Sequence, residues 1–347
     1  MNSNCAVFGC TITNRYTTMD TKALRQKILD LAIHGKLVPQ DPNDEPASVL
    51  LERIKAEKER LIKEGKIKRS KKSAKTSDTP HYENVPFEVP SSWVWCRLDD
   101  IVSFQGGYAY KSNTYVNQSD WQVIRIGNVK NDNLILDIQP VFVEDVIGKT
   151  TEKYLLKKDD ILFTMTGTKG KRDYFYTTKV PSIKKNLLLN QRVGCLRCFS
   201  SEINIDFLCL VLKGEYVLDA IFSTETGNVS QGNIGSESTL NLNIAIPPLT
   251  EQHRIVVEIE KWFALIDQIE QGKSDLQSTI KQTKSKILDL AIHGKLVPQD
   301  PNDEPASELL KRINPNFTPC DNGHYTQLPE GWTVAPMQVL CSLVDGD

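Results

Sequence analysis

The chain has 347 residues, of which 39% are hydrophobic and 25% charged, with a formal net charge of −2 at pH 7. These totals are typical of a soluble globular protein with about two domains of ~150 residues each, and the net charge alone does not indicate a nucleic-acid partner. Residues 1–18 lack a basic start and an apolar signal segment, and no run of 18 apolar residues occurs, so we expect no membrane insertion. The eight cysteines lack the density of a small secreted scaffold, and we expect a cytoplasmic location. A disordered N-terminal extension is expected at residues 1–20, with Met1 and Met19 as alternative starts.

One stretch of the sequence occurs twice. Residues 27–48 read KILDLAIHGKLVPQDPNDEPAS, and residues 286–307 have the same letters in the same order. Neighbouring repeats of this length usually stack into a solenoid, but these two copies are separated by the unrelated residues 49–285. We therefore expect one structural module at both borders of a domain, produced by a duplication or selected for one partner.

Residues 21–80 are predicted to contain the first copy of the repeat and a basic linker. Apolar residues at a spacing of four and three predict a short helix from Thr21 to about Ile33, and Gly35 suits the left-handed position after it. A second helix is expected after Pro46. Residues 66–75 carry six positive charges and no negative one, which is typical of a solvated linker, with direct phosphate contact as the alternative.

The pattern changes after Trp93 to short β-type runs separated by turn signals. One helix is expected within it, from Ile205 to Phe222. The fold class is therefore predicted as α+β, with one globular domain of mixed or antiparallel sheet over residues 81–250. Strands are expected at 123–126, 134–136, 161–163, 193–196 and 244–246.

Residues 251–293 are predicted to form a long coiled-coil spacer helix, because their apolar residues follow alternating steps of four and three. A single short helix cannot cover so long a stripe, so a second chain is expected to pair with it. The second copy of the repeat, at 294–327, and the truncated start of a second domain, at 328–347, are expected to follow. The predicted seam of the spacer consists of Ile255, Ile259, Trp262, Ile266, Ile269, Leu276, Ile280, Ile287 and Leu290.

Several catalytic functions are disfavoured, because the sequence lacks the residues that their motifs require. The glycine-rich residues 167–172 lack the spacing of a phosphate-binding Walker loop, and residues 243–248 place Ile where an amino-methyltransferase has Asn or Asp before Pro-Pro. The pair Asp159-Asp160 has the pattern of a turn entering a strand rather than of a nuclease site. Cys195 and Cys198 form a lone C-x-x-C, which favours a reduced pair on a strand over metal or redox use. We expect no catalytic residue, no metal and no cofactor.

A local excess of positive charge indicates DNA binding instead. Residues 157–197 contain ten basic residues and three acidic ones, with Tyr174, Phe175 and Tyr176 interleaved among them. The loops nearby carry amide and guanidinium side chains that are able to read base edges, although residues 227–233 also fit a plain glycine-rich turn. The predicted DNA-binding residues are Lys169, Lys171, Arg172, Lys184, Lys185, Gln191, Arg192, Asn228, Ser230, Gln231 and Asn233.

Together these features resemble one known family, the DNA specificity (S) subunits of type I restriction-modification systems. The resemblance is carried by the duplicated segment and by two Pro-x-x-Trp segments, which end at Trp93 and Trp332. It is also carried by residues 246–252, IPPLTEQ, which lead into the long helix. Residues 159–162 and 190–192 also resemble family landmarks. The resemblance extends over nearly the whole chain after its first residues.

The resemblance implies a non-catalytic, prokaryotic subunit that binds double-stranded DNA and directs adenine methylation and restriction to a target sequence. Its partners would be methyltransferase (modification) subunits and restriction subunits, and family members usually carry two recognition domains joined by an antiparallel helical spacer. This sequence departs from that plan by ending at Asp347, soon after Trp332. A second copy paired through the long helix is expected to restore two domains and a palindromic split target. The alternatives are a coiled-coil assembly subunit without specific DNA binding and an autonomous nuclease.

Overall fold

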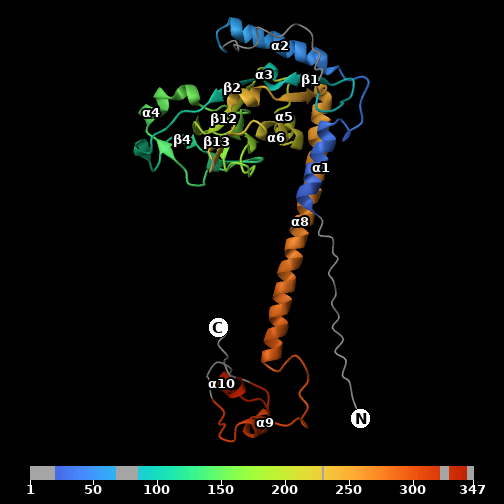
Figure 1. Cartoon of the computed structure of the whole chain (residues 1–347), viewed down its shortest axis with the longest axis vertical. Helices are drawn as coiled ribbons and strands as arrows, with labels where there is room; N and C mark the ends of the chain where they lie inside the picture. Colours follow the sequence, from blue (N-terminus) through green and yellow to red (C-terminus); the bar gives the residue numbers. More distant parts are fainter. Residues whose placement is uncertain (1–19, 68–84, 229, 321–327, 342–347) are drawn as a thin grey trace. The chain divides into compact units, whose positions relative to one another are not determined.

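The computed structural model describes residues 20–67, 85–228, 230–320 and 328–341 (Figure 1). The chain divides into two compact units, Met1–Ile266 and Asp267–Asp347, and the division falls within the helix α8 (Leu249–Ile292). The expected N-terminal extension and most of the basic linker lie outside the described residues.

The first copy of the repeat forms the end of helix α1 (Thr21–Ile33), a loop and the start of helix α2 (Ala47–Lys63), as predicted. The Asp20 side chain begins α1 by accepting a hydrogen bond from the Ala23 N–H at 3.0 Å, which satisfies one of the free donors of the first turn. Gly35 has φ +66°, which confirms the left-handed residue expected after α1.

A mixed sheet system forms the domain expected at residues 81–250, which we call the recognition domain after the resemblance given above, and confirms the α+β class. The first and last strands of the domain, β1 and β15, pair antiparallel, with Trp95 opposite Ala245. A four-stranded antiparallel sheet has the order β10-β8-β12-β2, and a second sheet has the order β11-β4-β7-β3 with β11 parallel to β4. Two smaller sheets have the orders β13-β14-β9 and β5-β6.

The strands confirm the five predicted runs, with ends that differ by no more than two residues, and add others that are too short to recognise from alternation. Their bounds are β1 Val94–Arg97, β2 Val102–Gly106, β3 Tyr115–Val116, β4 Trp121–Ile124, β5 Val129–Lys130, β6 Asn133–Leu134, β7 Phe142–Val143, β8 Ile161–Thr164, β9 Thr166–Gly167, β10 Thr177–Lys179, β11 Asn186–Leu189, β12 Val193–Cys198, β13 Thr226–Asn228, β14 Gln231–Asn233 and β15 Asn243–Ile246.

The single helix predicted from Ile205 to Phe222 is wrong. The structure has two helices, α5 (Ile205–Val211) and α6 (Glu215–Phe222), because the chain turns at Gly214, the N-cap residue of α6. A Cβ on Gly214 would lie 3.0 Å from Cδ1 of Ile33, so α1 packs tightly against this turn. The remaining short helices of the domain are α3 Leu98–Ile101, α4 Asp145–Thr150, α7 Ser236–Leu240 and the 3-10 turns Ser112–Thr114, Ile126–Asn128 and Glu152–Tyr154.

The main hydrophobic core of the first unit joins the repeat to the recognition domain. Ile28 and Ile33 of α1 are buried in the same cluster as Phe207 of α5, Trp95 of β1 and Ile255 of α8. The first copy of the repeat is therefore an integral part of this core, since burial of such side chains contributes roughly 1.5–3 kcal/mol each.

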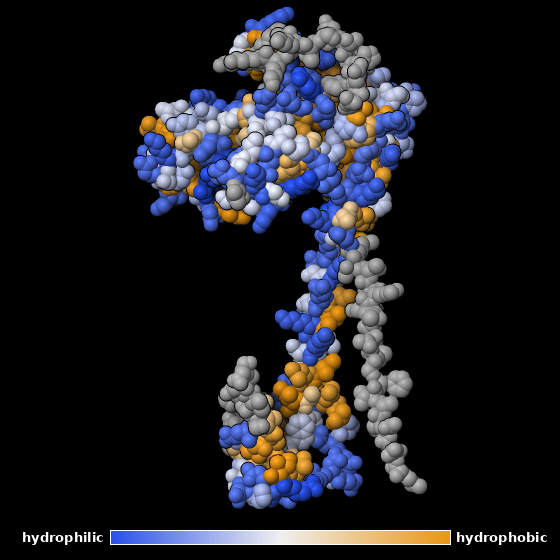
Figure 2. Space-filling model, viewed as in Figure 1, coloured by the Kyte–Doolittle hydropathy of each residue, from blue (hydrophilic) through white to orange (hydrophobic). Residues whose placement is uncertain are grey.

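Helix α8 confirms the predicted long helix, and its apolar seam has two parts. Ile255, Ile259 and Ile266 are buried in the core of the first unit. Figure 2 shows apolar side chains along the later part of α8 and over the elements that follow it. The exposed apolar residues there are Ile269, Leu276, Ile280 and Ile287, together with the earlier Trp262, whereas Leu290 is half-buried.

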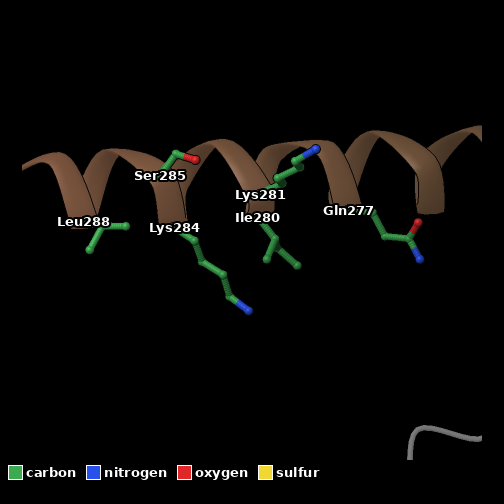
Figure 3. Close-up of a pocket in the computed structure, with 6 residues that line it drawn as sticks. All are labelled: Gln277, Ile280, Lys281, Lys284, Ser285 and Leu288. Carbon is green, nitrogen blue, oxygen red and sulfur yellow. The ribbon is translucent and has the colours of Figure 1, made fainter. Parts of the chain in front are cut away.

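A shallow depression lies on this part of α8 (Figure 3). It is lined by Ile280 and Leu288 together with Gln277, Lys281 and Lys284. An apolar stripe flanked by lysine and glutamine is typical of a helix face that pairs with another helix. Pairing of the seam with a second chain stays a prediction.

The second unit continues from α8 with the helices α9 (Ala306–Ile313) and α10 (Met337–Leu340). An apolar groove in this unit is lined by Ile292, Leu309, Leu310, Trp332 and Leu340. Among the described residues, no helix of either unit has the length and apolar character needed to cross a membrane.

Candidate nucleic-acid interface

Three loops that carry predicted DNA-binding residues meet at one edge of the recognition domain. The Arg192 carbonyl accepts a hydrogen bond from the Met165 N–H at 3.0 Å, and the Met165 carbonyl accepts one from the Ile234 N–H at 2.9 Å. Strand β9 then pairs with β14, with Thr166 opposite Asn233. The turn at Gln191 and Arg192, the loop after β9 and the β13–β14 hairpin are thereby held together.

The loop after β9 is fixed to the β13–β14 hairpin. Lys169 Nζ donates to the Gly227 carbonyl at 3.0 Å, and the Gly170 N–H donates to Glu225 Oε2 at 3.0 Å. Tyr174 Oη donates to the same carboxylate at 2.5 Å, and burial raises the pKa of this phenol above its usual value. Glu225 therefore acts as a clamp that positions the loop carrying Lys169 and Lys171.

Replacing Glu225 by alanine is expected to loosen this loop without unfolding the domain. The change leaves the Gly170 N–H without its acceptor, and a hydrogen bond to a charged group contributes about 1.5–3 kcal/mol. Hydrogen exchange at the Gly170 amide should therefore accelerate roughly tenfold to a hundredfold. Alanine at the exposed Asp137 is the matched control, and equal exchange at Gly170 in both variants would contradict the clamp.

The side chains of the hairpin are accessible. Asn228, Ser230 and Gln231 are exposed, while Asn233 is half-buried and its Oδ1 accepts a hydrogen bond from Gln231 Nε2 at 3.2 Å. Gln191 and Arg192 are also exposed on the neighbouring turn. Amide and guanidinium groups of this kind make bidentate contacts with adenine and guanine edges in a major groove.

Lys184 and Lys185 lie apart from these loops. They precede β11, whose first residue is Asn186, whereas Gln191 follows the last residue of that strand. Lys185 Nζ lies 6.0 Å from the centre of the Phe142 ring, on strand β7 of the same sheet. The structure therefore places the predicted basic residues at two ends of one strand.

Three of the basic residues between 157 and 197 are paired with acidic residues, two of them with acids from outside this segment. Arg172 contacts Glu215 at 3.1 Å and Asp219 at 2.6 Å, both on α6. Lys179 contacts Asp206 at 2.5 Å, and Arg197 contacts Asp160 at 2.5 Å. The exposed residues Lys169, Lys171, Lys184, Lys185 and Arg192 form no ion pair with a described residue.

The three aromatic residues interleaved with this charge are not a stacking surface. Tyr174 and Phe175 are buried, with the Phe175 ring 5.1 Å from Phe163 and the Tyr174 ring 5.0 Å from Phe222. Only Tyr176 is half-buried, with Lys130 Nζ 5.4 Å from its ring centre. Alternation of apolar and basic residues in this segment thus places two of the three rings in the core.

The residues considered for nuclease chemistry or for metal binding have other roles in the structure. Asp160, the buried member of the Asp159-Asp160 pair, is occupied by Arg197 and by the Lys157 N–H. Burial raises the pKa of the Cys195 thiol well above its usual value, which disfavours the thiolate that binds metal. Among the described residues, no three His, Cys, Asp or Glu side chains are grouped as metal ligands.

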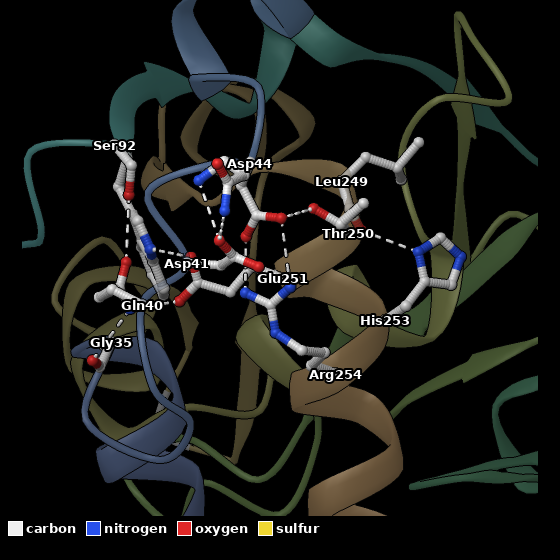
Figure 4. A network of polar contacts seen from close by, with 12 residues as sticks. Gly35, Gln40, Asp41, Asp44, Ser92, Leu249, Thr250, Glu251, His253 and Arg254 are labelled. Atoms are coloured by element: carbon white, nitrogen blue, oxygen red, sulfur yellow. Dashed lines mark hydrogen bonds and ion pairs between the residues drawn. The ribbon is translucent and has the colours of Figure 1, made fainter.

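A second polar network, at the start of α8, was not predicted from the sequence (Figure 4). Glu251 is fully buried and accepts hydrogen bonds from Gln40 Nε2 at 2.5 Å and from Trp93 Nε1 at 3.0 Å. Arg254 donates to Asp44 at 2.6 Å, and this contact holds the pKa of the Asp44 carboxyl below its usual value. We call this network the joint; it consists of Gln40, Asp44 and Trp93 on one side and Thr250, Glu251 and Arg254 on the other.

The joint binds the loop of the first repeat copy to the helix that leaves the recognition domain. Thr250 Oγ1 donates to Asp44 Oδ1 at 2.5 Å, next to the Arg254 contact. Burial raises the pKa of Glu251, so its charge is tolerated only because both carboxylate oxygens accept a hydrogen bond. Gln40 and Asp44 lie within the repeat, and Trp93, Thr250 and Glu251 lie in the segments that carry the family resemblance, but nothing in the sequence indicates that these residues contact one another.

Comparison with known proteins decides the family. Residues 90–277 match the family model described as "Type I restriction modification DNA specificity domain", which is more than half of the chain. The chain belongs to this family. The matched residues include the three loops and the start of α8, and the match confirms the family that the sequence resembles.

Individual specificity subunits are similar over most of this chain. The type I restriction enzyme EcoEI specificity subunit of Escherichia coli is 32% identical over 84% of this chain and 54% of its own length. The EcoAI specificity subunit of Escherichia coli is 31% identical over 94% of this chain and 63% of its own length. The chain thus spans somewhat more than half the length of these relatives.

Solved structures of type I systems are also similar. One, described under "complex assembly and conformational transition of the type I R-M system", has a TM-score of 0.46 and 17% identity, and covers 80% of this chain and 58% of that chain. The HsdS subunit from Thermoanaerobacter tengcongensis has a TM-score of 0.42 and 16% identity, over 80% of this chain and 57% of that chain.

Proposed function

We propose that the chain is the sequence-specific DNA recognition subunit of a cytoplasmic type I restriction-modification complex. It binds double-stranded DNA, makes no catalytic contribution itself, and directs methyltransferase subunits and restriction subunits to one target sequence. Residues 81–250 are the recognition domain, 251–293 the spacer, and 21–80 and 294–327 its two flanking modules. Two copies pair through the exposed seam of α8, which gives two recognition domains and a palindromic split target.

The observation that carries the proposal is the meeting of three loops with exposed readout side chains at one edge of the domain. Lys169 and Lys171 would contact phosphates, because their ammonium groups are exposed and free of acidic partners among the described residues. Gln191, Arg192 and Gln231 would read bases from the adjoining turn and hairpin. Lys184 and Lys185 would contact the backbone farther along the duplex.

Two alanine variants separate backbone contact from base readout. Lys171→Ala should weaken binding to all duplexes alike and reduce the slope of log K against log salt by about one. Arg192→Ala should cost about 1–3 kcal/mol on the selected target and much less on random duplex, since it removes a base contact. The measurement is duplex titration at several salt concentrations, with the chain co-purified with its modification subunits and the target selected from a random pool.

Lys55→Ala, at an exposed position on α2, is the matched control for the charge change and should bind as the parent chain does. A scaffold without specific binding would select no sequence at any salt concentration. Cleavage of DNA by the purified chain with a divalent metal would overturn the non-catalytic assignment. Mapping of methylated adenines then identifies the target.

A further inference from the structure

The second copy of the repeat folds like the first. Gly35 and Gly294 have φ +66° and +63°, and a Cβ on either would collide with a proline ring, Pro90 at 2.5 Å or Pro329 at 2.2 Å. The two copies therefore form the same loop around a following Pro-x-x-Trp segment. Shared hydrogen bonds include His34 Nδ1 with the Asp30 carbonyl and His293 Nδ1 with the Asp289 carbonyl, both at 2.7 Å, and Ala47 N with Ser92 O at 2.9 Å and Ala306 N with Gly331 O at 2.8 Å.

The environments of identical apolar side chains differ sharply between the copies. The first copy buries three large side chains of α1 in the core of the recognition unit, and the second exposes their counterparts on α8. Ile28, Leu29 and Ile33 are 4%, 5% and 3% exposed, whereas Ile287, Leu288 and Ile292 are 48%, 62% and 42% exposed.

The joint residues of the repeat also occur twice, but among the described residues only the first copy contacts Thr250, Glu251 and Arg254 of α8. In the first unit, Asp44 is held by Arg254 and Thr250. Its counterpart Asp303 is exposed, and no side chain of the described residues bonds to it. Trp332 Nε1 donates a hydrogen bond to Oε1 of Gln299, a residue of the second copy of the repeat, at 3.0 Å. The corresponding Trp93 Nε1 in the first unit donates instead to Glu251 of α8.

We infer that the second copy of the repeat docks onto the recognition unit of a second molecule of this chain, at the same surface that the first copy covers. Asp303 would bind the partner's Thr250 and Arg254, and Ile287 and Ile292 would enter the partner's core. Each chain thus offers two identical modules and one acceptor surface. This inference rests on the pairing of two copies proposed above and specifies which residues join them.

The contacts that the second copy would make with the partner are the ones that the first copy makes within its own chain. Because the two copies of the repeat are identical in sequence, the 22 repeated residues of the second copy are able to make the contacts that those of the first copy make. Exchange of equivalent elements between protomers is a low-cost route to a dimer. The exposed seam at Ile269, Leu276 and Ile280 would add area to the exchanged pair.

The first copy has an advantage within one chain, so the dimer should depend on concentration. Helix α2 has 17 residues and its counterpart α9 has 8. In α2, Arg53 contacts Glu202 at 2.7 Å and Lys58 Nζ donates to the Asp99 carbonyl at 2.6 Å, and these contacts hold the first copy in place. Weakening the first copy should consequently favour docking of the second.

The same substitution in the two copies provides a matched test. Asp303→Ala should raise the dimer dissociation constant of the full chain at least about tenfold, since it removes a charge-assisted contact from each exchanged joint. Asp44→Ala should lower that constant, because it weakens only the competing first copy. Analytical ultracentrifugation over a range of concentrations, without DNA, measures both constants, and circular dichroism checks that each variant is folded.

Cysteine pairs provide a second measurement that does not depend on affinity. Thr250→Cys with Asp303→Cys should give a covalent dimer on a non-reducing gel, whereas Thr250→Cys with Asp44→Cys should give a cross-linked monomer. Mass spectrometry of the linked peptides separates these bonds from bonds of native cysteines.

Three results would overturn the inference. A parent chain that stays monomeric at all concentrations would remove the pairing and the exchange together, while leaving DNA recognition to be tested separately. A dimer unaffected by Asp303→Ala would retain the pairing and remove the exchange. A second copy that captures only a recognition domain from a different specificity chain would replace the proposed partner.

Discussion

Replacing Asp160 by alanine is expected to destabilise the recognition domain by about 1.5–3 kcal/mol, because it removes the charge-assisted hydrogen bonds of the half-exposed Arg197. Asp160 is 1% exposed, and its two carboxylate oxygens accept from Arg197 Nε at 2.6 Å and Nη2 at 2.5 Å. The Lys157 N–H also donates to it, at 2.8 Å. Since this pair joins the turn before β8 to the central strand β12, urea unfolding should show a lower midpoint.

The neighbouring Asp159 is the control for this prediction. It is exposed, its φ is +67°, and its nearest cation, Lys158 Nζ, is 3.7 Å away. Asp159→Asn keeps a residue that tolerates this backbone conformation, so its unfolding free energy should change by no more than about 0.5 kcal/mol. Equal losses from the two substitutions would show that the ion pair is not what stabilises the turn.

Asp159 and Asp160 illustrate the difference between what local sequence predicts and what depends on tertiary structure. The pattern around Asp159 and Asp160 was correctly interpreted as a turn entering a strand, since local propensity determines such turns. The role of Asp160 could not be predicted, because its partner Arg197 lies on another strand and pairs through tertiary structure. Local sequence likewise did not show that Gly214 divides the helix expected from Ile205 to Phe222.

The charge pairing within the candidate interface could not be predicted from the sequence. Counting charges within residues 157–197 identified the basic segment, but the acids that neutralise Arg172 and Lys179 come from α5 and α6 and are invisible to a local count. The joint was missed for a similar reason, because Gln40 and Glu251 are 211 residues apart. The duplicated segment was the one sequence signal that such a distant partner existed.

Replacing Gly35 by alanine is the second change with a large expected effect, a loss of about 2–5 kcal/mol from the first unit. The left-handed conformation at φ +66° costs an L-residue roughly 1–2 kcal/mol, and forcing a methyl group into a packed site costs about 1–3 kcal/mol more. A Cβ would lie 2.5 Å from Cγ of Pro90 and 3.3 Å from the Trp93 ring. Because Trp93 donates to Glu251, displacing it would also open the joint.

Gly65→Ala separates the backbone cost from the collision. Gly65 has φ +69°, yet nothing lies within 4 Å of a Cβ built on it, so the loss should be limited to about 1–2 kcal/mol. Denaturant unfolding of the two variants should therefore differ by roughly the overpacking cost. If Gly35→Ala lost no more than Gly65→Ala, the close packing of the repeat loop on the Pro-x-x-Trp segment could not be what secures the start of α8.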